Sequence, residues 1–190
     1  GYDKDKSKRW PLLVFLHGAG ERGSVLEMVR AHGPHKEIAK GRKFPAIVVS
    51  PQCPERQWWD VDILEAWLND VTKRLRVDPD RVYLTGLSMG GYGTWAWSCA
   101  RPDRFAAIAP ICGGGDPTQA AKLRNMPVWA THGDSDPVVP LAQSQAMIDA
   151  IKAAGGSPRL DVVKGGQHDV WTDVYAKEDI FTWLLAQRRK

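Results

Sequence analysis

Short apolar runs alternate with helical patterns along most of this chain, and that alternation restricts its fold more than any other feature. The first run, residues 11–16, leads directly into His17-Gly18-Ala19-Gly20, as expected of a buried parallel strand that ends in a glycine-rich loop. Five further runs predict strands at 46–49, 81–85, 105–109, 128–131 and 159–163. Periodicity predicts helices at 61–76, 88–100, 141–154 and 176–189, with a weaker candidate at 25–32, and Asp78-Pro79 is expected to close the first of them.

This order of elements predicts an α/β fold with a mainly parallel sheet of about six strands and helices on both faces. In such sheets the loops at the carboxyl ends of the strands form the ligand-binding crevice. The 190 residues fit a single domain, residues 1–190. The span 110–126, between two predicted strands, is too short to form a helical lid over the crevice.

Composition and charge argue against several classes of function. Hydrophobic residues make up 43% of the chain and charged residues 25%, as in ordinary soluble globular proteins. The net charge of +4 is concentrated in residues 1–45, but no stripe of Lys and Arg interleaved with aromatic residues follows, so we expect no nucleic-acid partner. The longest run without charges, 82–100, contains four glycines and predicts a strand, a turn and a helix, so we expect no membrane partner.

The cysteines and the amino terminus bear on compartment and cofactors. Cys53, Cys99 and Cys112 form no Cys-x-x-Cys or Cys/His cluster, so we expect no metal or other cofactor, and at most one disulfide can form. The chain begins with Gly1 and a polar stretch, which favours a mature or excised domain with other domains upstream. We expect a secreted or periplasmic protein and leave a cytoplasmic location open.

One motif, Gly86-Leu87-Ser88-Met89-Gly90, carries a specific chemical prediction. It matches G-x-S-x-G and lies between a predicted strand and an apolar helix, which is the context that this motif requires. A strand that turns abruptly into a helix holds the serine in a strained conformation with Oγ exposed, and the two glycines avoid collisions there. We therefore expect Ser88 to be a nucleophile, the alternative being a simple glycine-rich turn.

A serine hydroxyl needs a base to take its proton, and only two histidines follow Ser88. His132 lies at a strand end and is expected to be structural, whereas His168 lies in a loop after the last predicted strand and is the better base. A carboxylate must orient the imidazole. Asp136 fits this role, with Asp134 in the same loop as the alternative, because the sequence cannot show which carboxylate faces His168.

Acyl transfer also needs donors for the developing oxyanion, commonly two backbone N–H groups. One is expected from Met89, directly after the nucleophile. The other is expected from the loop that starts at His17, with Ala19 as the preferred donor. On its own, that loop could equally be a simple strand exit.

Four blocks of this sequence, taken together and in order, resemble those of the α/β-hydrolase fold, and within it the phospholipase/carboxylesterase and polyhydroxybutyrate-depolymerase-like esterases. The blocks are residues 16–23 (LHGAGERG), 86–91 (GLSMGG), 132–140 (HGDSDPVVP) and 166–168 (GQH). The resemblance implies a serine esterase with Asp136 as the triad acid and Ala19 as an oxyanion donor. Members of this fold usually have two further strands before the one predicted at 11–16. Their lack in this sequence favours a piece of a longer polypeptide, with a minimal hydrolase as the alternative.

Three of the nine tryptophans fall near the predicted crevice. Trp58, Trp59 and Trp171 are expected either to bind substrate or to pack under loops, and the sequence does not decide between the two. Because no lid fits, we expect a shallow, open acyl pocket and activity on esters of short acyl chains.

The leading hypothesis is a serine carboxylic ester hydrolase that works through an acyl-enzyme and acts on a small-molecule or polysaccharide-linked ester. A serine peptidase of the same fold is the second hypothesis, ranked lower because no anchor for a peptide terminus is visible. The third is a binding module that keeps the fold without the chemistry.

Overall fold

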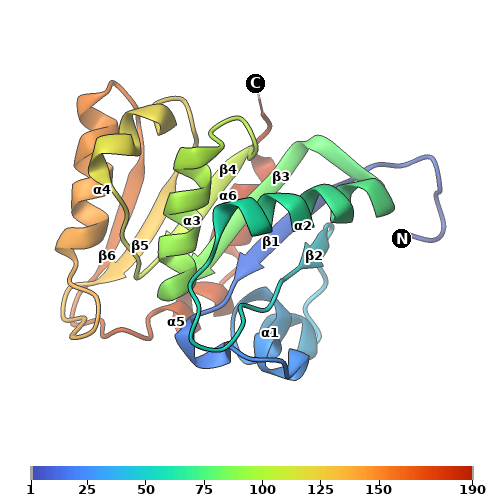
Figure 1. Cartoon of the computed structure of the whole chain (residues 1–190), viewed down its shortest axis with the longest axis horizontal. Coiled ribbons are helices and arrows are strands. Elements are labelled where there is room, and N and C mark those ends of the chain that lie inside the picture. Colours follow the sequence, from blue (N-terminus) through green and yellow to red (C-terminus); the bar gives the residue numbers. More distant parts are fainter. Residues whose placement is uncertain (1, 190) are drawn as a thin grey trace.

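The computed structural model describes residues 2–189 and contains one six-stranded sheet in the order β2-β1-β3-β4-β5-β6, in which every pairing is parallel (Figure 1). The strands are β1 (Trp10–Leu16), β2 (Ile47–Val49), β3 (Val77–Leu87), β4 (Ala107–Ile111), β5 (Trp129–Gly133) and β6 (Arg159–Val163). The α-helices are α1 (Gly33–Ala39), α2 (Val61–Arg74), α3 (Met89–Ala100), α4 (Ala142–Ala153), α5 (Trp171–Ala176) and α6 (Asp179–Ala186). The predicted α/β fold is confirmed.

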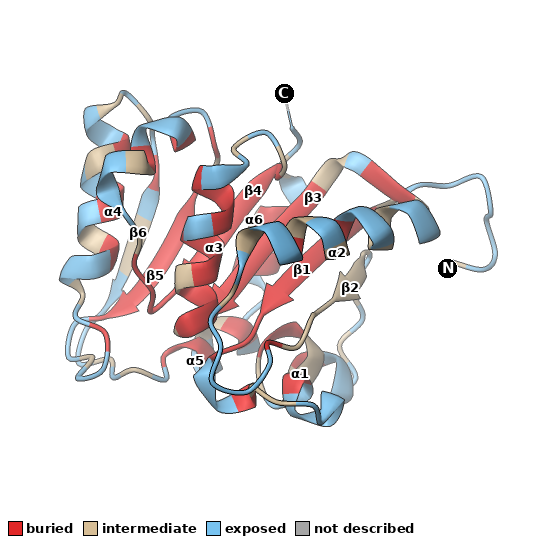
Figure 2. Cartoon of the chain, viewed as in Figure 1, coloured by how far each residue is buried: buried red, intermediate tan, exposed pale blue. Residues whose placement is uncertain are grey.

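Alternating side chains of β1 enter two separate cores, one on each face of the sheet. Leu12, Val14 and Leu16 belong to one cluster, and Leu13 and Phe15 belong to the other. Helices α2, α3 and α4 cover the first face, and α5 and α6 cover the second (Figure 1). The central strands are therefore buried on both sides, as Figure 2 shows, which explains why they are continuously apolar in the sequence.

Several boundaries differ from the predicted ones. Asp78-Pro79 does not close a helix but lies inside β3, where the register with β1 shifts between Trp10 and Leu12. The weak candidate at 25–32 is a short 3-10 helix, η2 (Leu26–Arg30). The helix predicted at 176–189 is shorter in the structure, where it corresponds to α6 (Asp179–Ala186). Helices α1 and α5 were not predicted, because each has only six or seven residues, too few for a clear periodic pattern.

The run without charges at 82–100 is the end of β3, one turn residue and α3. It passes through the middle of the sheet and then packs on it, so its apolar character reflects burial between layers. Within residues 2–189, no helix is long and apolar enough to cross a membrane.

Candidate active site

Ser88 forms the sharp turn between β3 and α3 and has φ 53° and ψ −119°. A positive φ is unfavourable for a residue with a Cβ atom, by about 1–3 kcal/mol. Two backbone hydrogen bonds hold it there: the N–H of Ser88 donates to the carbonyl of Ile111 (2.9 Å), and its own carbonyl accepts from Tyr92 (3.0 Å). The strained turn predicted from the motif is present.

The two glycines of the motif are required because backbone atoms approach them closely. A Cβ atom on Gly90 would lie 2.0 Å from the carbonyl oxygen of Leu16, and one on Gly86 would lie 2.3 Å from the carbonyl oxygen of Gly90. The first turn of α3 therefore packs directly on the end of β1, which brings Ser88 next to the loop that follows β1.

The hydroxyl, imidazole and carboxylate predicted to act together lie in contact. Nε2 of His168 lies 2.9 Å from Oγ of Ser88, and Nδ1 of His168 lies 2.7 Å from Oδ2 of Asp136. Since a carboxylate only accepts hydrogen bonds, Nδ1–H donates to Asp136, and Nε2 of the neutral ring can accept the hydroxyl proton. This is the geometry of a nucleophile, a base and a group that orients the base.

Asp136 has a buried side chain with its oxygens fully engaged. Burial alone raises the pKa of Asp136, but hydrogen bonds from His168 and from the backbone N–H groups of Val139 and Val138 outweigh it and hold that pKa below its ordinary value. Asp134, the alternative acid, instead accepts from the N–H of Gly165 (2.7 Å). Of the two carboxylates, Asp136 is thus the one in contact with His168.

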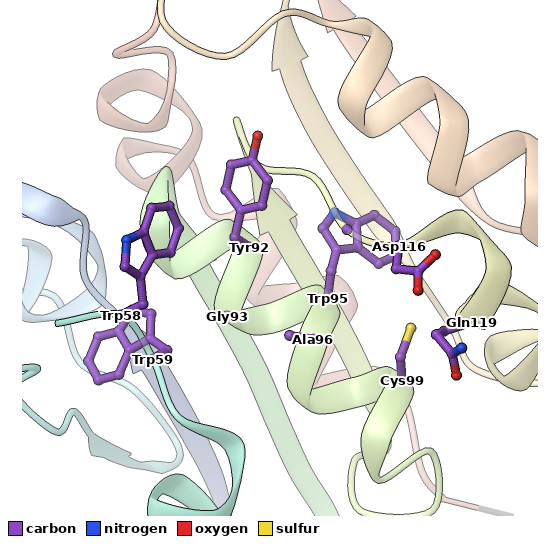
Figure 3. Close-up of a pocket in the computed structure, with 10 residues that line it drawn as sticks. Trp58, Trp59, Tyr92, Gly93, Trp95, Ala96, Cys99, Asp116 and Gln119 are labelled. Atoms are coloured by element: carbon purple, nitrogen blue, oxygen red, sulfur yellow. The ribbon is translucent and has the colours of Figure 1, made fainter.

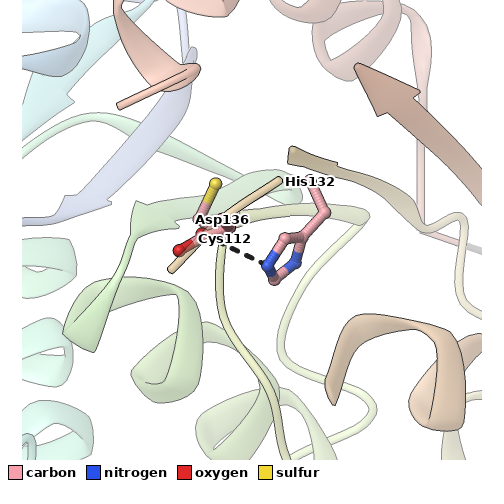
Figure 4. A group of neighbouring side chains, drawn as sticks. All are labelled: Cys112, His132 and Asp136. Carbon is pink, nitrogen blue, oxygen red and sulfur yellow. Dashed lines mark ion pairs between the residues drawn. The ribbon is translucent and has the colours of Figure 1, made fainter. Parts of the chain in front are cut away.

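His132 is fully buried beside Asp136, with its Nε2 at 3.4 Å from Oδ2 (Figure 4). Its Nδ1 lies 2.7 Å from the hydroxyl of Ser144, and its Nε2 lies 2.8 Å from the carbonyl oxygen of Val139. Together with Cys112, His132 and Asp136 bring three potential metal ligands within 4.8 Å of one another. Both ring nitrogens of His132 and Oδ2 of Asp136 thus have hydrogen-bonding partners within the protein, which is consistent with a structural position for His132.

The three cysteines are buried and unpaired, so none of them forms the disulfide that the sequence left open. Burial raises the pKa of Cys99 to about 11 and that of Cys112 to about 12, and it raises the pKa of Cys53 as well. Since the thiolate is the reactive form, a thiol nucleophile is disfavoured at neutral pH.

We expect the folded protein to react with Ellman's reagent at pH 8 at far less than one equivalent within minutes, and the unfolded protein to release three equivalents. Absorbance at the wavelength of the released thiol measures both values. Rapid modification of a folded thiol, with loss of activity, would contradict this assignment.

The two backbone groups proposed as oxyanion donors are the first N–H groups of helices. Met89 begins α3, and Ala19 begins the 3-10 helix η1 (Ala19–Glu21), so neither N–H has an acceptor inside its own helix. A Cβ atom on Gly18 would lie 3.6 Å from Cβ of Ser88, so the loop that carries Ala19 borders the nucleophile.

The three tryptophans named from the sequence have different surroundings. Trp58 is 64% exposed, and its ring meets that of Tyr92 edge-on, with centroids 6.0 Å apart. Trp59 is partly buried and donates its indole N–H to the carbonyl of His17 (3.2 Å). Trp171 is buried, and its ring contacts that of His168 (centroids 4.9 Å apart), so it packs behind the imidazole.

Trp58 and Trp59 form a wall shared by two cavities of about 350 and 330 Å³. The first runs along the outer face of α3, with Trp58 and Trp59 at one end and Asp116 and Gln119 at the other (Figure 3). Tyr92 also lines it, one helical turn after Ser88. This residue was not predicted, because nothing in the pattern of an apolar helix singles it out.

The parallel sheet and the turn at Ser88 together place this protein in the α/β-hydrolase class. The family model described as the dienelactone hydrolase family matches residues 39–176. The chain therefore belongs to the dienelactone hydrolase family, which confirms the resemblance to the α/β-hydrolases seen in the sequence.

Similar proteins include esterases of several kinds. The crystal structure of a thermostable esterase superimposes with a TM-score of 0.86 at 30% identity, covering 97% of this chain and 56% of that chain. Probable feruloyl esterase C of Aspergillus terreus is 28% identical over 185 residues (91% of this chain, 66% of that protein). Poly(3-hydroxyalkanoate) depolymerase C of Paucimonas lemoignei is 53% identical over 119 residues (55% and 28%). The chain thus spans less than two thirds of the length of each.

Proposed function

We propose that this protein is a serine carboxylic ester hydrolase with Ser88 as nucleophile, His168 as base and Asp136 as the acid that orients it. The observation that carries the proposal is the pair of contacts through the imidazole, 2.9 Å to the Ser88 hydroxyl and 2.7 Å to Asp136. The similarity to proteins named esterases supports an ester as the bond that is cleaved.

Acylation begins when Oγ of Ser88 attacks the ester carbonyl while Nε2 of His168 takes the hydroxyl proton. The N–H groups of Met89 and Ala19 stabilise the negative charge that develops on the carbonyl oxygen. Asp136 stabilises the imidazolium, which then donates its proton to the departing alcohol. The products of this step are the free alcohol and an acyl group on Ser88.

Deacylation follows the same chemical steps, with water as the nucleophile in place of Ser88. His168 removes a proton from water, which attacks the acyl carbonyl, and the same imidazolium returns that proton to Oγ of Ser88. The carboxylic acid leaves and the enzyme is restored without a cofactor in the reaction.

The substrate that we propose has a short acyl group, carried by a small molecule or by a polysaccharide. In the span 110–126, where a lid would have to fit, the structure has the end of β4 and one helix, the short 3-10 helix η3 (Pro117–Leu123). The partly open cavities beside Trp58 offer mostly apolar walls, which suit an acyl or alcohol group of modest size. Trp58 and Trp59 are therefore proposed as walls of the substrate site, and Trp171 as a support for His168.

A series of p-nitrophenyl esters from acetate to palmitate tests the proposal. We expect kcat/KM to be highest at two to four carbons and to fall by about 10-fold or more at long chain length, because each carbon beyond the cavity stays in water. An optimum at palmitate would contradict the open site, and the lack of hydrolysis of every ester would contradict the ester hydrolase itself.

A secreted or periplasmic location is part of this proposal. The unpaired cysteines do not bear on it, since buried thiols persist in either compartment. Fractionation of cells that make the full-length protein, followed by assay of each fraction with p-nitrophenyl acetate, measures the location directly.

A further inference from the structure

Glu21 is a buried carboxylate that the proposed mechanism does not use. Its residue is 8% exposed, and its Oε2 accepts a hydrogen bond from the N–H of Gly18 (2.9 Å). Its Oε1 faces Nε2 of His32 at 3.7 Å. Burying a carboxylate is costly unless it is paired and hydrogen-bonded, so its contacts point to what it does. They lead to the loop that carries Ala19.

The peptide group between His17 and Gly18 is held at both of its polar atoms by side chains. Its carbonyl oxygen, on His17, accepts the indole N–H of Trp59 (3.2 Å). Its N–H, on Gly18, donates to Glu21. Trp59 is itself fixed, because its ring contacts the His17 ring (centroids 4.7 Å apart).

The next peptide group, between Gly18 and Ala19, is held at its carbonyl only. Nδ1 of His17 lies 2.6 Å from the carbonyl oxygen of Gly18, and Nε2 of His17 accepts the N–H of Cys53 (3.0 Å). A neutral ring with its proton on Nδ1 satisfies both contacts, in agreement with burial lowering the pKa of His17. Because C=O and N–H of a trans peptide point in opposite directions, this contact also sets the direction of the Ala19 N–H.

Three of the four polar atoms of these two peptide groups are therefore tied to side chains, and the fourth is the N–H proposed to meet the oxyanion. We propose that Glu21, together with His17 and Trp59, is a positioning residue that aims the Ala19 N–H at the oxyanion of the ester hydrolysis proposed above. The inference rests on that proposed function. Glu21 touches no reacting atom, so its effect reaches the transition state only through the loop.

The close packing around Gly18 explains why a side chain is needed to hold the loop. A Cβ atom on Gly18 would lie 2.8 Å from Cδ1 of Leu87 and 3.3 Å from Oε2 of Glu21, so a larger residue there would have to displace these side chains. Glycine alone leaves the backbone free to rotate. The carboxylate of Glu21 supplies the constraint that the missing side chain cannot.

The test replaces Glu21 and measures turnover with p-nitrophenyl acetate. We expect Glu21→Ala to lower kcat by about 10- to 100-fold while KM stays within about 3-fold. The reason is that an oxyanion donor stabilises the transition state more than the bound ester, so its displacement affects mainly kcat. The affinity for a trifluoromethyl ketone, which forms a tetrahedral adduct with serine, should fall by the same factor. Glu21→Gln keeps an oxygen acceptor and should retain kcat within about 3-fold.

Glu37→Ala is the matched control, since Glu37 is a comparably buried carboxylate in α1 that pairs with Lys40 and Arg42, away from this loop. It should lower the unfolding midpoint without changing kcat. If Glu21→Ala does not fold, Trp59→Phe, which removes the indole N–H together with part of the ring, should lower both kcat and the affinity for the trifluoromethyl ketone by about 3- to 10-fold.

Unchanged kcat in Glu21→Ala overturns the inference, as does unchanged kcat in Trp59→Phe when only that variant folds. An equal loss of kcat in Glu21→Ala and Glu37→Ala also overturns it, because both would then act through stability. Failure of the proposed function itself would give a different result: Ser88→Ala would then hydrolyse p-nitrophenyl acetate as fast as the parent protein.

Discussion

Replacing Ser88 by alanine is expected to lower kcat for p-nitrophenyl acetate by about 10³-fold or more, to near the background of the remaining oxyanion donors. The variant should also lose labelling by a fluorophosphonate, which bonds covalently to an activated serine. It should stay folded, since the hydroxyl of Ser88 forms a hydrogen bond only with His168 among the described residues. Stopped assays and gel fluorescence measure the two effects, with circular dichroism as the folding control.

Variants of the other two triad positions sharpen this test. His168→Ala should lose as much activity as Ser88→Ala, and Asp136→Asn somewhat less, because an amide still occupies the site but fixes the wrong ring tautomer. Asp134→Asn is the matched control, since Asp134 holds the N–H of Gly165 instead. A greater loss in Asp134→Asn than in Asp136→Asn would show that the acid is misassigned.

The second large effect is expected on stability, at the glycine that follows Met89. Gly90→Ala places a Cβ atom 2.0 Å from the carbonyl oxygen of Leu16, so either α3 or β1 must move. We expect the free energy of unfolding to fall by about 3 kcal/mol or more, and the midpoint of urea unfolding to fall with it. Such a shift also displaces Ser88, so activity should be lost in parallel.

Gly20→Ala provides the comparison, since a Cβ atom there would meet nothing within 4 Å and the backbone does not need glycine. Its free energy of unfolding should stay within about 1 kcal/mol of the parent value. Similar unfolding midpoints for the two variants would mean that β1 and α3 are not packed as tightly as the close approach at Gly90 implies.

The strands, and the turn that presents Ser88, were predictable from sequence because each has a local signature. The run at 11–16 is continuously apolar because β1 is buried on both faces, and the structure places β1 and β6 within one residue of the predicted strands, although β6 is a largely exposed edge strand. Ser88 was readable because its strained turn requires glycines on either side. The choice of Asp136 over Asp134 was not readable from spacing alone, because it depends on which way one loop turns.

Contacts between distant segments account for what the sequence could not supply. Glu21 has an ordinary loop context, and its role emerges only from the fold that brings Trp59 and the Gly18 peptide together. The short helices α1 and α5 are stabilised by contacts with each other more than by their own periodicity. For Trp171 the sequence left open whether it binds substrate or packs under a loop, and in the structure its ring is buried against His168.

The positive φ of Ser88 links catalysis to thermal stability, because the strained conformation that presents the nucleophile also destabilises the fold. Glycine would adopt this conformation without strain, yet glycine has no hydroxyl, so the turn cannot be relaxed without discarding the nucleophile. Adaptation to higher temperature must therefore come from other parts of the molecule, such as surface loops and the edge of the sheet, while the reactive corner keeps its unfavourable shape.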